Sequence, residues 1–236
     1  MVTAGAGRTG GRVPLNRERV LAGAMTVADA GGIGALTIRS LAQELAVKPM
    51  SVYHYVANKD EILDGIVDLV YGEVDLPTPG GDWRTEMRHR AGSARRVLAR
   101  HPWATALLQS RLRPGPATLA HHNAFVATLR TAGFSIELTA HAFALIDSYV
   151  FGFALSENAL PIHGPDTVAD TAASMMEQFF DAAAYPHLHE FTVEHIMRPD
   201  YDFGKEFDFG LTVILDGLAR SLPDRAGTGS SPGRPC

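Results

Sequence analysis

The segment LAQELAVKPMSVYHYVANKDEIL, residues 41–63, gathers side chains that can contact a polyanion. Two short apolar patterns meet at residues 46–48, which predicts a helix, a tight turn and a second short helix. The start and outer flank of that second helix carry Lys48, Met50, Ser51, Tyr53 and His54. Such side chains contact phosphates and base edges when a helix enters the major groove. The segment therefore predicts a helix-turn-helix, with an ordinary helical corner and a solvated face as the alternative.

Each of these residues has a chemistry that suits DNA. Lys48 can meet guanine acceptors or a phosphate, and Ser51 can hydrogen-bond to either. Tyr53 and His54 can reach a phosphate or pack on a sugar, and Met50 can touch a thymine methyl group. Lys59 opens the next helix, where backbone amides also favour a phosphate. The full predicted DNA-contacting set is Thr37, Arg39, Lys48, Pro49, Met50, Ser51, Tyr53, His54 and Lys59.

The elements that must position these side chains follow a helical period. Thr37 is a suitable N-cap, and Ile38, Leu41, Ala42 and Leu45 form one apolar face behind it. Pro49 suits the first turn of the second helix, whose inner side would be Val52 and Val56. Asn58 and Glu61 predict a capping box for a fourth helix. The first helix is expected to stop at Gly31-Gly32.

The rest of the chain also favours helices, and no segment shows the alternation of a strand. The expected fold class is all-α, with an N-terminal three-helix DNA-binding domain and a larger helical domain for ligand binding and dimerisation. The expected boundaries are a flexible arm at 1–14, the helix-turn-helix domain at 15–60, the effector and dimerisation domain at 61–222 and a disordered tail at 223–236. Further helices are expected at 83–101, 118–132, 135–160, 166–184 and 207–222, with an irregular connection at 185–202.

Composition places limits on the function. Hydrophobic residues make up 46% of the 236-residue chain, which is enough for a core. The only cysteine is Cys236, no signal peptide is visible, and no apolar run is expected to cross a bilayer, because Asp147 and Ser148 interrupt the longest one. We therefore expect a cytoplasmic protein without a membrane partner. The net charge of −5 is uneven, because residues 1–60 hold seven basic and four acidic residues. A basic end on an acidic body suits a reader of polyanions, although such an excess also arises by chance.

Residues 16–74 resemble the DNA-binding region of the TetR/AcrR family of bacterial transcriptional regulators. The resemblance rests on motifs in fixed register: Thr37-x-Arg39-x-Leu41-Ala42, Ala46-Val47 at the turn, Ser51-Val52-Tyr53, and Lys59-Asp60-Glu61-Ile62-Leu63. The chain departs from the usual pattern with Ala46 in place of the turn glycine, with Lys48-Pro49, and with the reversed pair His54-Tyr55. Residues 130–153, RTAGFSIELTAHAFALIDSYVFGF, look like part of a tetracycline-repressor-type C-terminal domain.

That resemblance implies a homodimer in which the helices at 135–160 and 207–222 pair with their symmetry mates as a four-helix bundle. The first of these helices is apolar nearly all round, so it must be covered on every side. Gly210 and Gly217 in the second would let another helix approach closely. The alternative is an ordinary monomer core. Two recognition helices of a dimer would read a palindrome in successive major grooves.

A small-molecule effector site is expected in the middle of the second domain. The aromatic and aliphatic residues that could line it are also ordinary core residues. The predicted effector-binding set is Trp103, Leu107, Arg111, His122, Phe125, Leu129, His141, Phe143, Ile146, Asp147, Tyr149, Val150, Phe153, Met176 and Phe179. Ser156 stands where tetracycline repressors are expected to hold a glutamate, so tetracycline is not the predicted ligand.

The segment HLHEFTVEH at 187–195 raises the question of a metal, but its spacing matches no common zinc site. A solvated loop or pocket lid is the preferred interpretation, and no metal or cofactor is predicted. The predicted function is a repressor released from its operator by an effector, with residues 59–74 as the lever between domains. Two alternatives stay open: a DNA-binding regulator that senses a protein partner, and a helical enzyme that uses its histidines.

Overall fold

The computed structural model describes residues 14–159, 171, 173–174 and 182–223 of the chain. Within these ranges every regular element is a helix, as the sequence predicts. The helices are α1 Arg17–Ala35, α2 Ile38–Glu44, α3 Pro49–Val52, α4 Lys59–Glu73, α5 Trp83–Arg100, α6 Ala104–Ser110, α7 Pro116–Thr131, α8 Ile136–Ala159, α10 Pro186–Phe191, the π-helix η1 Thr192–Ile196 and α11 Phe203–Arg220. The helix expected at 166–184 lies mostly outside the described residues.

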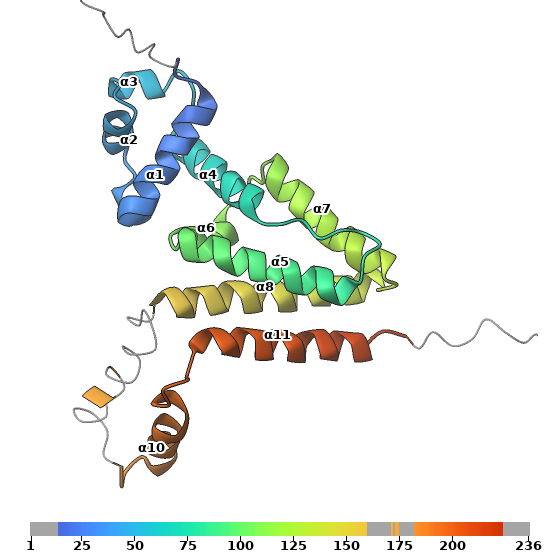
Figure 1. Ribbon diagram of the computed structural model, residues 1–236. Coiled ribbons are helices and arrows are strands. Elements are labelled where there is room, and N and C mark those ends of the chain that lie inside the picture. Colours follow the sequence, from blue (N-terminus) through green and yellow to red (C-terminus); the bar gives the residue numbers. More distant parts are fainter. Residues whose placement is uncertain (1–13, 160–170, 172, 175–181, 224–236) are drawn as a thin grey trace, which may run out of the picture.

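Helices α1 to α3 form a separate head, and α4 joins this head to the rest of the molecule (Figure 1). The head closes around Val20, Ala24, Leu41 and Val52, each with no exposed surface. These residues come from α1, α2 and α3, so the three helices share one small apolar core. Because α4 packs against both α1 and α7, it belongs to the cores of both parts.

Caps define where the helices of the head begin. The Thr37 hydroxyl accepts a hydrogen bond from the Ser40 amide at 3.0 Å, and the Ser40 hydroxyl accepts one from the Thr37 amide at 2.9 Å. This is the reciprocal capping box, here with serine as its second member. At α4, Asn58 Oδ1 accepts from the Glu61 amide at 2.9 Å, and Glu61 Oε2 accepts from the Ala57 amide at 2.7 Å. The second hydrogen bond lowers the pKa of the Glu61 carboxyl.

The helix α1 breaks at the expected Gly31-Gly32, but it continues for a further turn beyond this point. Gly32 leaves the helical conformation with φ of +72°, yet Ile33 to Ala35 resume the helix. Gly32 therefore makes a kink, because glycine enters the left-handed region without a steric penalty. The helix ends at Leu36, which is buried in the core of the head.

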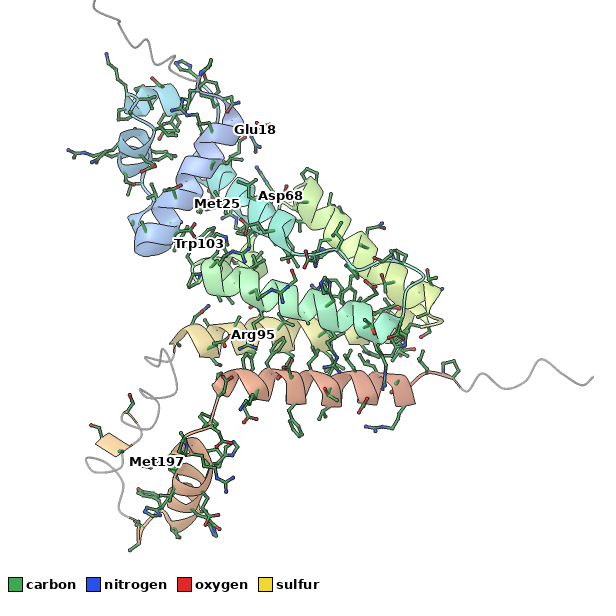
Figure 2. The ribbon with its side chains drawn as sticks, in the orientation of Figure 1. Glu18, Met25, Asp68, Arg95, Trp103 and Met197 are labelled. Carbon is green, nitrogen blue, oxygen red and sulfur yellow. The ribbon has the colours of Figure 1, made fainter. Side chains whose placement is uncertain are left out.

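The body is built around α8, which packs against α5, α7 and α11. Figure 1 shows α8 and α11 lying side by side along one edge of the body. Arg95 of α5 connects that helix to both α8 and α11 (Figure 2). Its side chain pairs with Glu157 of α8 and donates to the Gly204 carbonyl of α11. Gly210 of α11 makes room for Tyr149, since a Cβ there would lie 2.3 Å from the Tyr149 hydroxyl. Gly210 therefore allows α11 to approach α8 of the same chain closely.

The sequence predicted no apolar run long enough to cross a bilayer, and α8 contradicts this expectation. Among the described residues it is the one helix long and apolar enough to cross a bilayer, judged by length and composition alone. Its apolar residues have a packing explanation, because Ala142, Ile146 and Val150 are fully buried against the neighbouring helices. Asp147 does fall within this apolar run, and its carboxylate is paired with Arg90 inside the body.

The connection at 185–202 was expected to be irregular, but it contains α10 and η1. The expectation treated its prolines as breaks. Pro186 instead occupies the first position of α10, where its missing amide hydrogen is harmless. Figure 1 shows α10 projecting away from the body below α11.

Candidate nucleic-acid interface and effector site

The turn between α2 and α3 depends on an unusual backbone conformation at Ala46. Its φ of +54° makes it the one non-glycine residue with positive φ among the described residues. The amide of Val47 then donates to the Ala42 carbonyl at 2.9 Å, which closes the end of α2. A Cβ in the left-handed region is strained, so Ala46 holds a geometry that glycine would adopt more easily.

Helix α3 is shorter than expected but its orientation agrees with the prediction. Val52 and Val56 are 0% and 2% exposed, so they do form the inner side. The regular helix stops at Val52, and residues 53–55 continue as turns. Met50 is 71% and Tyr53 44% exposed on the outer side. A short helix with its N-terminal turn facing outward is the arrangement that major-groove reading requires.

Most of the predicted DNA-contacting side chains lie on the surface. Exposed residues of the set are Thr37, Arg39, Lys48, Pro49, Met50, Tyr53, His54 and Lys59, and Ser51 is half-buried. Across the described ranges Arg39, Lys48 and Lys59 take part in no ion pair, which leaves three cations free for phosphates. Thr37 differs from the others because its hydroxyl already caps α2. Figure 1 places α2 and α3 at the end of the molecule away from α8 and α11.

Two buried side chains, one of them a predicted effector residue, instead join the head to the body. Trp103 donates from Nε1 to Asp29 Oδ1 of α1 at 2.6 Å, and Figure 2 shows it beneath that helix. His101 Nδ1 lies 2.7 Å from the same Asp29 oxygen, and its Nε2 lies 3.2 Å from Glu73 Oε2 of α4. Trp103 and His101 are both buried. This Asp29 contact therefore holds α1 against the corner between α5 and α6.

Arg111 makes a second connection of this kind. It follows α6 and reaches α4, with Nε 2.6 Å from Asp64 Oδ1 and Nη1 3.0 Å from Asp60 Oδ1. Hydrogen bonds and nearby carboxylates stabilise its charged form and raise its pKa. Arg111 is thus occupied at the junction, and the structure does not bring it to Asp147. Because Arg111 connects the end of α6 to α4, a movement of α6 would also displace α4, the helix that carries the head.

A buried polar cluster occupies the centre of the body. Arg90 of α5 is 1% exposed, and its Nη1 lies 2.6 Å from Asp147 Oδ1 of α8, at angles outside hydrogen-bonding range. Its Nε donates to His121 Nε2 of α7 at 3.2 Å, and its guanidinium lies 4.9 Å from the centre of the Phe125 ring. Three helices are therefore joined through one arginine, whose charge the Asp147 carboxylate compensates.

Burial keeps the neighbours of this ion pair neutral. It lowers the pKa of His121 to about 3, with a further contribution from the Arg90 charge. It also lowers the pKa of His122. The ring of Tyr71 of α4 contacts both histidines at tilted or edge-on angles. Burial, together with the Asp147 charge, raises the pKa of its hydroxyl to about 12. At neutral pH the cluster thus contains one compensated pair and uncharged hydrogen-bonding groups.

The predicted effector residues do not lie together in the structure. Asp147 lies in the buried cluster, beside His122, Phe125 and Phe143, whose rings contact one another. Leu129, Ile146 and Val150 are fully buried core. Tyr149 and Phe153 face α11, where the Tyr149 hydroxyl donates to the Glu206 and Phe207 carbonyls. Leu107 is half-buried on α6 and His141 is exposed, while Met176 and Phe179 lie outside the described residues.

Sequence reasoning missed Tyr71, Arg90 and His121. Arg90 did leave a signal, because it falls on the apolar stripe of α5 with Met87, Ala94 and Val97. A charged residue at a core position needs a partner, and that requirement points to the core of the domain. The several arginines of this helix obscured the signal, since only Arg90 among them lies on the stripe.

The histidine-rich segment forms no metal site in the described part of the chain. No group of three or more His, Cys, Asp or Glu side chains is placed there to hold an ion. His195 lies 3.1 Å from Glu206 of α11, and His187 is close to Glu190 on its own helix. These are exposed pairs on the surface of α10, η1 and α11.

The fold and the head define a helix-turn-helix DNA-binding protein. Residues 20–66 match the family described as "Bacterial regulatory proteins, tetR family", and residues 76–222 match the "Tetracyclin repressor-like, C-terminal domain". The chain belongs to this family and is one of its transcriptional regulators. The recognition made from the motifs at 37–63 is thereby confirmed, as is the all-α fold.

Relatives extend over nearly the whole chain. A transcriptional regulator of Saccharopolyspora erythraea is 31% identical over 207 residues, 87% of this chain and 85% of that protein. The transcriptional repressor DrrR1 of Streptomyces coeruleorubidus is 31% identical over 92% of this chain and 82% of its own length. The structure of ActR from Streptomyces coelicolor in complex with actinorhodin has a TM-score of 0.74 at 28% identity and covers 91% of this chain and 100% of ActR.

Proposed function

We propose that this chain is a homodimeric repressor that binds a palindromic operator and is released from it by a small-molecule effector. The exposed start of α3, braced by buried Val52 and Val56, is the observation that carries the DNA-binding part. It would act in the cytoplasm, where the DNA is, and not as an enzyme. Membership of a family of transcriptional regulators supports both statements.

The proposed DNA-contacting surface consists of the exposed residues of α2, α3 and the start of α4. Arg39, Lys48 and Lys59 supply charge for phosphates, while Met50, Ser51, Tyr53 and His54 are near enough to the N-terminal turn of α3 to reach base edges or sugars. Pro49 sets the first turn of that helix. Thr37 acts indirectly, because its hydroxyl fixes the start of α2.

The proposed dimer surface is an apolar stripe on α8 and α11. Leu145 and Leu155 of α8 are 51% and 58% exposed, and Phe209 and Val213 of α11 are 71% and 52% exposed. Gly217 continues the spacing of Phe209 and Val213, and a Cβ at this position would meet no atom within 4 Å. A stripe of this kind favours a helical partner, and a second copy would bury it symmetrically.

The effector is proposed to bind at the buried cluster of Arg90, Asp147 and His121. The cluster joins α5, α7 and α8, and its His121 also contacts Tyr71 of α4, the helix that carries the head. An effector can release DNA only through a difference in affinity for two conformations. ActR, solved with (S)-DNPA and with actinorhodin, supports a ligand-responsive mechanism.

A protein partner as the signal is the second candidate. It is favoured by the small size of the cavity beside the cluster, about 10 Å³, which is about enough for one water molecule. A regulator that senses a protein needs no internal space. The two candidates differ in whether an apolar small molecule enters the body.

Footprinting on the chain's own upstream region tests the DNA-binding part. A dimer should protect two half-sites whose centres are one helical turn apart, roughly 34–36 Å, or a multiple of it. Protection of a single half-site at every concentration would argue against the dimer. Absence of protection on that region and on a selected pool of duplexes would overturn the proposal.

A further inference from the structure

We infer that the effector site takes an uncharged, mainly apolar molecule that carries a hydrogen-bond acceptor, such as an aromatic ketone, and that Phe151 closes its entrance. The inference rests on the proposed function and specifies the chemistry of that same site. It is carried by an unsatisfied donor on His121 and by the position of Phe151 between two empty spaces.

The tautomer of His121 follows from its contact with Arg90. Arg90 Nε can only donate, so His121 Nε2 must accept, and the proton of the neutral imidazole must lie on Nδ1. His121 is 1% exposed, and its Nδ1 has no hydrogen-bond partner among the described residues. A buried N–H without a partner is unfavourable, so an acceptor atom that reached it would be bound selectively.

The charge of the surroundings favours a neutral acceptor. Asp147 already compensates Arg90, and burial keeps His121 neutral by lowering its pKa to about 3. An ionised ligand would bring a charge with no counterpart into this region. The remaining wall of the cavity is mainly apolar, formed by Val70, Val74, Ala94, Leu98, Leu108 and Phe151. A ketone or quinone oxygen on an aromatic skeleton fits both features.

The cavity beside His121 must enlarge before it can hold such a molecule. A groove of about 440 Å³ lies outside it, between α6 and α8, and its lining includes Thr105, Gln109, Ser148 and Phe151. Phe151 lines both spaces and is 8% exposed. Displacement of its ring would therefore join the groove to the cavity that His121 lines.

The groove itself offers a second polar group. The hydroxyl of Thr105 is buried, and it too lacks a hydrogen-bond partner in the described part of the chain. It lies on α6, the helix that continues to Arg111 and its contacts with α4. A ligand that passed Phe151 would thus occupy space against α6. Leu155 borders the groove and belongs to the proposed dimer stripe, so a partner copy would lie beside the entrance.

The test compares 9-fluorenone with fluorene, which share a ring skeleton but differ in the carbonyl group. Equilibrium dialysis against the full-length protein should show fluorenone bound about tenfold more tightly than fluorene, which corresponds to one hydrogen bond. His121→Phe should abolish this preference. His89→Phe is the matched control on the neighbouring α5, because His89 is exposed, and it should retain the preference.

Phe151→Ala provides an independent readout if His121→Phe fails to fold. Removal of the ring should join the two spaces and increase the affinity for fluorenone severalfold. Equal binding of the two compounds by the unmodified chain, or binding of neither, would overturn the inference. Footprinting on DNA uses neither compound, so it tests the proposed function separately. If the protein protects its operator but binds fluorenone and fluorene equally, only this inference is refuted.

Discussion

Acid should destabilise this protein through His121 in a way that a single substitution can isolate. Burial lowers the pKa of His121 from 6.5 to about 3 in the folded chain. Below pH 6.5 the unfolded chain therefore binds a proton that the folded chain does not. The contribution of His121 to stability is complete above pH 6.5 and is lost progressively as the pH falls toward 3.

The size of the loss follows from the cited shift. Each pKa unit corresponds to about 1.4 kcal/mol, so a fall from pH 7.5 to pH 5 should remove about 2 kcal/mol of unfolding free energy through this residue. His121→Gln keeps an acceptor for Arg90 Nε but cannot titrate. The natural chain should therefore lose about 2 kcal/mol more than this variant over the same interval.

Urea unfolding of both proteins at the two pH values, at one fixed protein concentration, measures this difference. Other titrating groups, including His122 with its lowered pKa, contribute to both proteins and cancel in the comparison. Parallel loss of stability in the two proteins would refute the reasoning, because it would show that His121 is already accessible to protons in the folded state.

Three further outcomes are expected. Ala46→Gly should raise the unfolding free energy by about 1 kcal/mol, because it removes Cβ strain at φ of +54°, and thermal unfolding checks it. Asp29→Ala should cost about 1–3 kcal/mol in urea unfolding, since the buried donor of Trp103 loses its acceptor; an unchanged midpoint would contradict the contact. Arg39→Ala and Lys48→Ala should each weaken operator binding and reduce the slope of log affinity against log salt by about 1, with unchanged dimer stability.

The head could be derived from the sequence because its information is local. The cap at Thr37, the apolar spacing of α2 and the pair Val52 and Val56 each act within a few residues, and the structure agrees with all three. The exact length of α3 could not be derived in this way. Its end depends on how residues 53–55 turn toward α4, which is a matter of tertiary packing.

The proposed effector site was harder to predict because it depends on pairs distant in sequence. Arg90 and Asp147 are 57 positions apart by their numbers, and neither indicates its partner by local pattern. Trp103 is an aromatic residue of the type that often lines pockets, yet its indole donates a hydrogen bond to Asp29 of the head. Aromatic residues line pockets, cores and junctions alike, so composition alone could not separate these roles.

The central claim is that α3 and its surroundings read DNA. Fluorescence anisotropy of the purified protein with a labelled duplex from its own upstream region, in excess nonspecific competitor and at two salt concentrations, tests it most directly. The account predicts tight, competitor-resistant binding that weakens as salt rises. Binding that the competitor removes completely, both on this duplex and on duplexes selected from a random pool, would contradict it.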